Sequence, residues 1–191
     1  MKRKAYNQGP VTIRSMPFWC VGNPLADPFG SKVLPGISSI EVAKILCWAA
    51  GEGLIEATSF HDDDLVPWDP KKPNDDLDKN SETYATMKTI KAMLDKAGIS
   101  VNTATCSLHG SPIFRNGGLT NPDPKIRALA RSKVERTIRI GHFFGAKHYT
   151  YWVARDGFEV PVAVKWTDVY DWLAEGLDHV YDYIKAKGFK N

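Results

Sequence analysis

The feature that most constrains the fold is a regular series of glycines, each placed where a helical pattern ends. They are Gly53, Gly98, Gly145 and Gly188, spaced 45, 47 and 43 residues apart. Glycine adopts the left-handed conformation without steric cost, so it often marks the end of a helix. The first three precede strand-length runs rich in β-branched or aromatic residues, LIEATSF, ISVNTAT and AKHYTYW. The sequence therefore predicts repeated helix–strand units.

Four amphipathic segments lead up to these glycines. They cover residues 38–50, 81–97, 123–144 and 167–187. Apolar side chains recur in them at roughly helical spacing. The expected N-caps are Ser38 or Ser39, Ser81, Asp123 (with Pro124 at the first helical position) and Thr167. Three tryptophans in these helices are expected in the core: Trp48, Trp166 and Trp172.

Alternating helices and strands indicate an α/β fold with a parallel sheet and helical crossovers. A first strand over VTIRSMPFW, residues 11–19, completes four strand–helix units. Both a doubly wound sheet and a (β/α)₈ barrel fit this order. A complete barrel takes about 250 residues, so these 191 residues are too few to close one alone.

Composition excludes several classes of function. The net charge is +3 and no basic cluster carries interleaved aromatics, so we expect no nucleic-acid partner. No run approaches the ~18 apolar residues of a membrane span, and the basic start lacks the apolar region of a signal peptide. The three cysteines form no CxxC pattern, which is typical of reduced thiols in a cytoplasmic protein.

The expected strand ends carry the residues that can do chemistry, because parallel strands present their carboxyl ends at one edge. These ends read PFW, SFHDDD, TATCSLH and YTYW. They bring together Trp19, His61, Asp62, Asp63, Asp64, Thr105, His109 and Trp152. Aromatic walls with a few polar groups fit a sugar or small polyol better than a phosphate. The segment CVGNPLADPFG also lacks a glycine-rich phosphate motif.

The run HDDD, residues 61–64, has two interpretations. If the chain turns after His61, Asp64 swings back to the imidazole, fixes its tautomer and makes the other nitrogen a better base. Three adjacent carboxylates would then need a cation to offset their repulsion. Alternatively, the aspartates are solvated residues of a polar loop. Pattern alone favours the loop.

Four segments of the chain resemble the xylose isomerase family. FHDDDLVPW is similar to the signature around that family's catalytic histidine. FWCVGNPLADPFG, TATCSLHGSPIFRNGGLT and YWVARDG are similar to the family's first, third and fourth strands with their loops. The matches lie in family order and cover nearly the whole chain. The resemblance implies one domain, residues 1–191, built as four β/α units of a TIM (β/α)₈ barrel, that is, its N-terminal half.

The resemblance also implies roles for single residues. His61 would hydrogen-bond the sugar ring oxygen and assist ring opening, and Asp64 would orient it. Trp19 and Trp152 would line the sugar site. Thr105 would help to hold the network of water and substrate around the histidine.

Three further positions either act between subunits in the family or differ from its pattern. Phe29, in DPFG, would enter the site of a neighbouring subunit. His109 stands where the family usually has an aromatic wall residue, so it would loosen the wall, add a polar contact to the substrate, or place a second imidazole near His61. Ser107 replaces a family asparagine.

The activity implied by the resemblance is aldose–ketose isomerisation, of D-xylose to D-xylulose and of glucose to fructose. The family uses a hydride shift assisted by two divalent ions, usually Mg or Mn. Its metal ligands and catalytic lysine lie on the fifth strand and beyond, so we expect no metal ligand among these residues. A single chain would carry the ring-opening half of the machinery.

Two copies of such a chain could pair as a homodimer and complete an eight-stranded barrel. Half a barrel would expose two sheet edges and an apolar inner face, which favours pairing. The aspartates of both copies could then form a new metal site. One alternative is a non-catalytic half-barrel that binds a sugar or acts as a scaffold. A metal-dependent hydrolase of the related endonuclease-like barrels ranks last, because basic groups are lacking beside the site.

Overall fold

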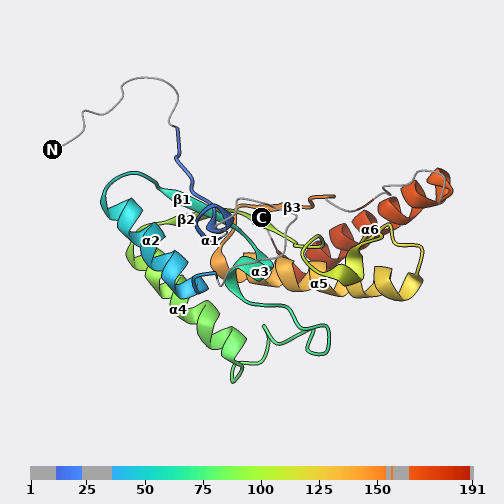
Figure 1. The fold of residues 1–191 in the computed structure, drawn as a ribbon, viewed down its shortest axis with the longest axis horizontal. Coiled ribbons are helices and arrows are strands. Elements are labelled where there is room, and N and C mark those ends of the chain that lie inside the picture. Colours follow the sequence, from blue (N-terminus) through green and yellow to red (C-terminus); the bar gives the residue numbers. More distant parts are fainter. Residues whose placement is uncertain (1–11, 23–35, 154–155, 157–163, 190–191) are drawn as a thin grey trace.

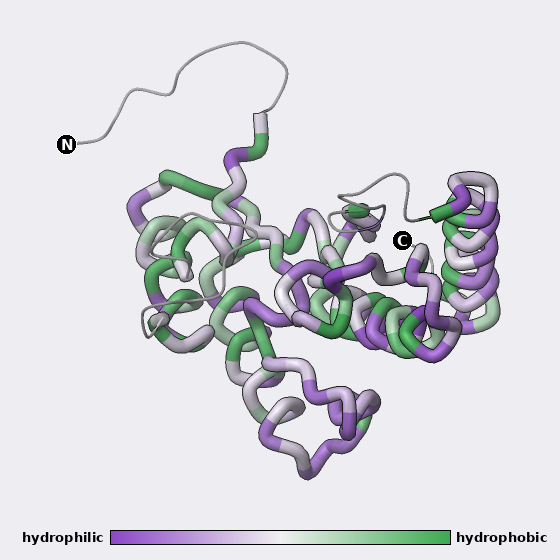
Figure 2. The backbone as a smooth tube through the Cα atoms, turned by 45° about the vertical axis from the view of Figure 1, so that its right-hand side comes forward, coloured by the Kyte–Doolittle hydropathy of each residue, from purple (hydrophilic) through white to green (hydrophobic). Residues whose placement is uncertain are grey.

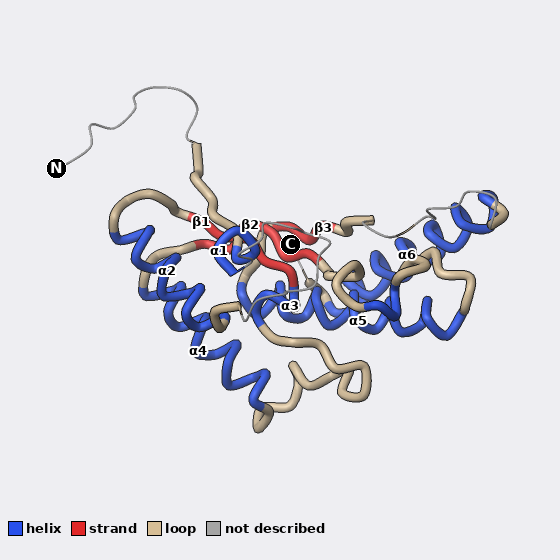
Figure 3. Tube along the Cα trace, in the orientation of Figure 1, coloured by secondary structure: helices blue, strands red, loops and turns tan. Residues whose placement is uncertain are grey.

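The computed structural model describes residues 12–22, 36–153, 156 and 164–189 (Figure 1). Three parallel strands form one sheet in the order β1-β2-β3 (Figure 3). They are β1 (Ala57–His61), β2 (Ser100–Thr105) and β3 (His148–Thr150). The helices are α1 (Phe18–Gly22), α2 (Ser39–Gly51), α3 (Asp62–Leu65), α4 (Glu82–Lys96), η1 (Pro112–Phe114), α5 (Pro124–Phe144) and α6 (Trp166–Lys187).

The predicted alternation of strands and helices is confirmed for the part of the chain that the structure describes. Helix α4 connects β1 to β2, and α5 connects β2 to β3. The long helices α2, α4, α5 and α6 lie on the same side of the strands in Figure 1. The sheet is open rather than closed into a barrel.

The predicted first strand over residues 11–19 is wrong, because the described residues of this range, 12–19, form only one isolated bridge and then a helix. Ser15 makes an isolated parallel bridge to Ala57, and the Met16 N–H donates to the Ala57 carbonyl at 3.1 Å. From Phe18 the chain is helical. Pro17 explains the change, because it has no N–H for a strand ladder but is well tolerated where a helix begins. Trp19 therefore reaches the strand ends from helix α1 and not from a strand.

Three of the four predicted caps are confirmed. Each cap side chain accepts a backbone N–H of its own helix: Ser38 from Glu41, Ser81 from Tyr84 and Asp123 from Lys125. The fourth is wrong, because α6 begins at Trp166 and its N-cap is Lys165, which makes no side-chain cap bond. Thr167 lies inside the helix.

The repeated glycines have the predicted left-handed conformation. Their φ angles are +67° (Gly53), +68° (Gly98), +70° (Gly145) and +66° (Gly188). A different glycine fixes the distance between layers. A Cβ built on Gly141 of α5 would lie 2.8 Å from the Cβ of Ala104 in β2. Helix α5 therefore packs against the sheet at van der Waals distance, which brings its polar residues close to the strand ends.

Two apolar clusters hold the elements together. One joins α1, α2, α4, the strands and the end of α5, and is centred on Leu46, Phe60 and Ile90. The other joins the loop after β2 to α5 and α6, and includes Cys106, Phe114 and Val134. Figure 2 shows apolar residues alternating with polar ones along the helices, and mainly polar residues in the loop after α3. No described helix is long and apolar enough to cross a membrane.

The face of the sheet away from the long helices is polar, which corrects the expected apolar inner face. Parallel register places Ser59, Thr103 and His148 in one row and His61, Thr105 and Thr150 in the next. The alternate row of Phe60, Ala104 and Tyr149 points to the helices, and Phe60 packs on Phe144 of α5. The sheet therefore buries its apolar row and presents hydroxyls and imidazoles on its other face.

Two of the three helix tryptophans are not in the core. Trp48 is 62% exposed and Trp166 is 40% exposed, so the expectation of burial was wrong for both. Trp172 is half-buried, with the Arg127 guanidinium 4.5 Å from its ring centroid.

Candidate functional site

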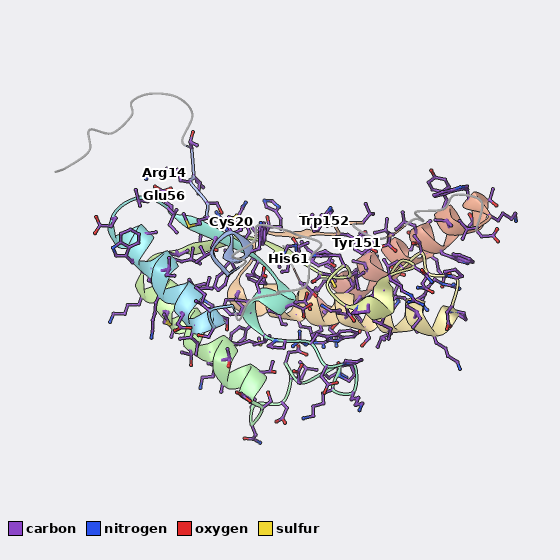
Figure 4. All side chains as sticks on the ribbon, in the orientation of Figure 1. Arg14, Cys20, Glu56, His61, Tyr151 and Trp152 are labelled. Carbon is purple, nitrogen blue, oxygen red and sulfur yellow. The ribbon has the colours of Figure 1, made fainter. Side chains whose placement is uncertain are left out.

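Four rings from separate segments meet at the carboxyl ends of the strands. The His61 ring centroid lies 4.6 Å from Trp19, 5.2 Å from His109 and 5.8 Å from Trp152. His109 and Trp152 are 4.7 Å apart. Figure 4 labels His61 and Trp152 beside each other, near the end of the sheet. All four side chains had been predicted to converge from sequence, and the structure brings them together.

Of the two interpretations of HDDD, the structure shows the less favoured one, the turn after His61. Helix α3 begins at Asp62, directly after β1, so the chain bends at the imidazole. Asp64 Oδ2 accepts the His61 backbone N–H at 2.7 Å and lies 3.2 Å from His61 Nδ1. A carboxylate at Nδ1 favours a proton on that nitrogen and leaves Nε2 for other partners. His61 is 8% exposed, so this pairing is only weakly screened by water.

The polar-loop interpretation is wrong for Asp62, which is 0% exposed. Its Oδ1 accepts the Ser107 backbone N–H at 2.8 Å. Its Oδ2 lies 2.5 Å from Lys133 Nζ and 3.5 Å from a guanidinium nitrogen of Arg136, and both cations are buried. Lys133 also reaches Asp63 at 3.2 Å. Helix α5 thus supplies the cations that three adjacent carboxylates require.

These charges shift one another's ionisation. Burial raises the pKa of Asp63 to about 6, the charge of Asp62 adds to this rise, and Lys133 partly offsets it. Burial alone would lower the pKa of Lys133, but the carboxylates of Asp62 and Asp63 outweigh burial and raise it. Lys133 therefore remains a cation inside the protein.

Thr105 lies next to His61 across the sheet. The two residues are in register, so both side chains belong to the same face, and Thr150 continues the row. Thr105 is 5% exposed. This position suits a hydroxyl that helps to order groups around the imidazole.

His109 follows β2 in the loop SLHG and is 8% exposed. Its ring meets both His61 and Trp152 edge to face. Burial is the main cause that lowers the pKa of His109 to about 4, with further contributions from His61 and Lys133. The second imidazole is therefore neutral at neutral pH, whereas His61 has a carboxylate partner.

Sequence reasoning missed the residues of α5 that support the site, Lys133 and Arg136. Both occur in a basic stretch, RSKVERTIR, that is typical of an exposed helix face. The available signal was the unbalanced charge of HDDD, which required a cation without saying where it would lie.

An open cavity of about 1030 Å³ adjoins the site from behind Asp64. Its lining includes Phe18, Asp63 and Asp64, together with the N-termini of α2 and α4. None of the four clustered rings lines it. The cavity therefore gives water access to the carboxylate side of the His61–Asp64 pair rather than to the rings.

The described residues do not fit a Mg or Mn site. Among them, no group of three or more His, Cys, Asp or Glu side chains could hold a metal ion. Asp62 and Asp63 are bound by Lys133, and Asp64 by His61, so each carboxylate already has a positive or hydrogen-bonding partner, although Asp63 Oδ1 itself has none among the described residues. Phe29, the expected inter-subunit residue, lies outside the described residues.

The fold and the site define an α/β protein with a polar, aromatic-walled site at the carboxyl ends of parallel strands. Residues 50–190 match the family described as the xylose isomerase-like TIM barrel, and the chain belongs to this family. The resemblance seen in the sequence is thereby confirmed, and the expected fold is confirmed as TIM-barrel-like.

Two curated relatives are xylose isomerases of Thermus species. The xylose isomerase of Thermus thermophilus is 32% identical over 185 residues, which cover 96% of this chain and 44% of the relative. The xylose isomerase of Thermus caldophilus matches with the same identity and coverage. The chain thus spans less than half the length of these relatives.

Proposed function

We propose that this chain binds an aldose, a pentose or hexose such as D-xylose or D-glucose, and opens its ring. The observation that carries the proposal is the His61–Asp64 pair, with 3.2 Å between Nδ1 and Oδ2, set among two tryptophans and a second histidine. Indole faces suit the apolar faces of a sugar ring. Thr105 and His109 are the substrate-binding polar groups in this proposal.

His61 performs the chemical step in this proposal. Asp64 accepts a hydrogen bond from Nδ1–H and stabilises the imidazolium form of His61. In that form Nε2–H donates to the sugar ring oxygen, and as the C1–O5 bond breaks the proton passes to O5. The O1–H proton passes to a base, water in the simplest case, as its bonding pair forms the C1=O1 bond, and the product is the open-chain aldehyde. Ring closure returns the proton to His61, so the step is reversible and interconverts the α and β anomers.

The test is anomer exchange of D-xylose, followed by exchange NMR on the purified full chain. The parent chain should accelerate exchange above the rate in buffer. His61→Asn and Asp64→Asn should each reduce the enzymatic rate by about 10²–10⁴-fold, the usual contribution of a positioned acid or base. A matched control is His142→Asn, which changes an exposed histidine of α5.

Methyl β-D-xyloside separates binding from chemistry, because its ring cannot open. His61→Asn should leave the affinity for this glycoside within about threefold, since the tryptophans remain. Anomer exchange at the buffer rate in the parent chain would overturn the ring-opening proposal. Binding of the glycoside in that case would support the alternative, a non-catalytic sugar-binding or scaffold protein.

The complete aldose–ketose isomerisation of xylose to xylulose is a further proposal, since the described residues do not fit the divalent ions that the family uses. The chain would form one domain over residues 1–191, with four β/α units as half of a (β/α)₈ barrel. Further strands must then supply the metal ligands and the groups for the hydride shift.

Pairing of two copies is one way to supply further strands. In this proposal the open edge at β3 of one copy meets the segment before α1 of the other. The mass in solution, measured by light scattering together with divalent-metal content, tests it. A dimer mass supports pairing, and a monomer at all concentrations contradicts it.

A further inference from the structure

The two imidazoles of the site lie close together but in different environments. Their ring centroids are 5.2 Å apart with an interplanar angle of 71°, and each residue is 8% exposed. They come from neighbouring strands, since His61 ends β1 and His109 follows β2. Trp152 lies against both rings, at 5.8 Å from His61 and 4.7 Å from His109. A ligand that reaches one imidazole along Trp152 therefore reaches the other.

The surroundings of the rings favour different protonation states. Asp64 Oδ2 lies 3.2 Å from His61 Nδ1, so a carboxylate stabilises the His61 imidazolium. The charged groups that act on His109 are His61 and Lys133, which disfavour a positive charge there, and Asp64 and Asp62, which favour it. Burial is the largest influence and also disfavours the charge, and the pKa of His109 falls to about 4. An imidazole paired with a carboxylate, beside one whose charge is disfavoured by burial, suits the roles of acid and base.

Ring opening of an aldose needs both roles at adjacent atoms. The ring oxygen O5 must gain a proton and the hydroxyl oxygen O1 must lose one, and both oxygens are attached to C1. Resting on the proposed function, we propose that His109 is a second catalytic residue, the general base that removes the O1 proton while His61 protonates O5.

The proposed step is balanced in atoms and charge. Nε2–H of the His61 imidazolium gives its proton to O5, and a ring nitrogen of neutral His109 accepts the proton from O1. The C1–O5 bond breaks with its electron pair on O5, and the O1–H pair forms the C1=O1 bond. His61 is left neutral and His109 protonated, so the positive charge moves from one imidazole to the other. Ring closure on either face of C1 reverses both transfers.

Three substitutions of His109 separate catalysis from packing and from simple hydrogen bonding. His109→Phe keeps a planar ring against Trp152 but has no base. His109→Gln accepts a hydrogen bond but takes no proton at neutral pH. His109→Ala opens space for added imidazole. Circular dichroism and thermal melting establish that each variant is folded before kinetics are compared.

The expected result is a fall of at least about 100-fold in the rate of anomer exchange for both His109→Phe and His109→Gln. Affinity for methyl β-D-xyloside, which has no O1–H for His109 to accept, should fall far less than the exchange rate in the Phe variant, by less than about tenfold. Added imidazole should restore exchange in His109→Ala and leave His61→Asn unchanged. The parent rate should fall as pH drops toward 4, and this acid limb should vanish in the His109 variants.

An exchange rate in His109→Phe within about threefold of the parent would overturn the inference, and so would full activity of His109→Gln. Either result leaves the proposed function standing if His61→Asn is inactive. A parent chain that binds the glycoside without accelerating exchange would instead remove the proposed function itself. The two failures are therefore distinguishable in the same set of measurements.

Discussion

The turn after β1 and the loop after β2 both place a histidine at the site, yet they stabilise it in opposite ways. In the turn, residues 61–64, every carboxylate has a cation or an imidazole beside it. In the loop, residues 106–109, the histidine packs against the rings of His61 and Trp152, and burial outweighs the attraction of the nearby carboxylates. Direct pairing with an opposite charge favours the ionised form of a buried group, whereas burial itself favours the neutral form. Two identical side chains can thus do different chemistry 5.2 Å apart.

Asp62 links these two regions. It belongs to the turn, but its Oδ1 accepts the backbone N–H of Ser107 in the loop at 2.8 Å. A carboxylate makes this bond stronger than a neutral acceptor would, because charge-assisted hydrogen bonds are the stronger kind. The nearest cation to Asp62 is Lys133. The difference between the environments of His61 and His109 therefore depends in part on Lys133, a residue of α5 that belongs to neither the turn nor the loop.

The largest expected effect comes from removing that lysine. Lys133→Met leaves Asp62 buried without its nearest cation, so we expect a loss of about 3–5 kcal/mol in the free energy of unfolding. Urea denaturation measures it. The matched control is Lys91→Met, which breaks the exposed pair Lys91–Asp95 of α4 and should cost less than about 0.5 kcal/mol.

The double variant Asp62→Asn/Lys133→Met sharpens this test. Removing both charges should recover part of the lost stability, because Asp62 no longer carries an unpaired charge and only Asp63 still lacks its cation. If Lys133→Met alone is as stable as the parent, the buried ion pair does not support the turn. The contrast between a charged turn and a neutral loop would then fail.

Much of the fold could be predicted from the sequence because its signals are local. Helix caps such as Ser81 and left-handed glycines such as Gly145 act within a few residues of their own helix. The turn at His61 was a possible interpretation for the same reason, since Asp64 is three residues away. The burial of Asp62 was not predictable in this way. It depends on Lys133, 71 residues further along the chain.

The predictions for the tryptophans divide in the same way, into those fixed by local position and those that depend on packing between distant segments. Trp19 and Trp152 were placed at the site by their position at strand ends, and the structure brings both to His61. Trp48 was assigned to the core because it lies in an apolar helix, but it is 62% exposed. The sequence of a helix identifies its buried face only where the opposite face is clearly polar. In α2 both faces carry apolar residues, among them Ile45, which is 39% exposed.

The next effect, of at most about 3 kcal/mol, concerns how stability depends on pH. The raised pKa of Asp63, about 6, means that the folded chain binds more protons than the unfolded chain between about pH 4 and 6. Stability from this group falls as pH rises through that window. The lowered pKa of His109, about 4, means that the folded chain binds fewer protons between about pH 4 and 6.5. Stability from His109 rises with pH there.

The two opposing slopes can be separated by substitution. His109→Phe removes the rising contribution, so the free energy of unfolding should fall as pH increases from 4 to 6. Asp63→Asn removes the falling contribution, so stability should increase over the same range. Urea denaturation at half-unit pH intervals measures both slopes. Equal slopes in the two variants would contradict the assignment of opposite environments to the turn and the loop.

The smallest expected effect concerns the segment after β3, which carries Trp152. Asp156 Oδ1 accepts the backbone N–H groups of Gly118 and Thr120 at 2.7 and 3.0 Å, and the Thr120 hydroxyl at 2.7 Å. Its Oδ2 accepts the hydroxyl proton of Tyr151. Tyr151→Phe removes one of four hydrogen bonds to a carboxylate that keeps the other three. We therefore expect a loss of about 1–2 kcal/mol in unfolding free energy.

The same variant tests whether the third loop supports the site as an independent unit. Tyr151 is adjacent to Trp152, so loosening its contact with Asp156 should weaken the affinity for methyl β-D-xyloside by about three- to tenfold, because Trp152 is then held less firmly. The slopes of stability against pH should be those of the parent, since Tyr151 is not among the main influences on the pKa of Asp63 or of His109. A changed slope would show that the segment after β3 shares the electrostatics of the other two regions, and the contrast would then extend to three strand ends.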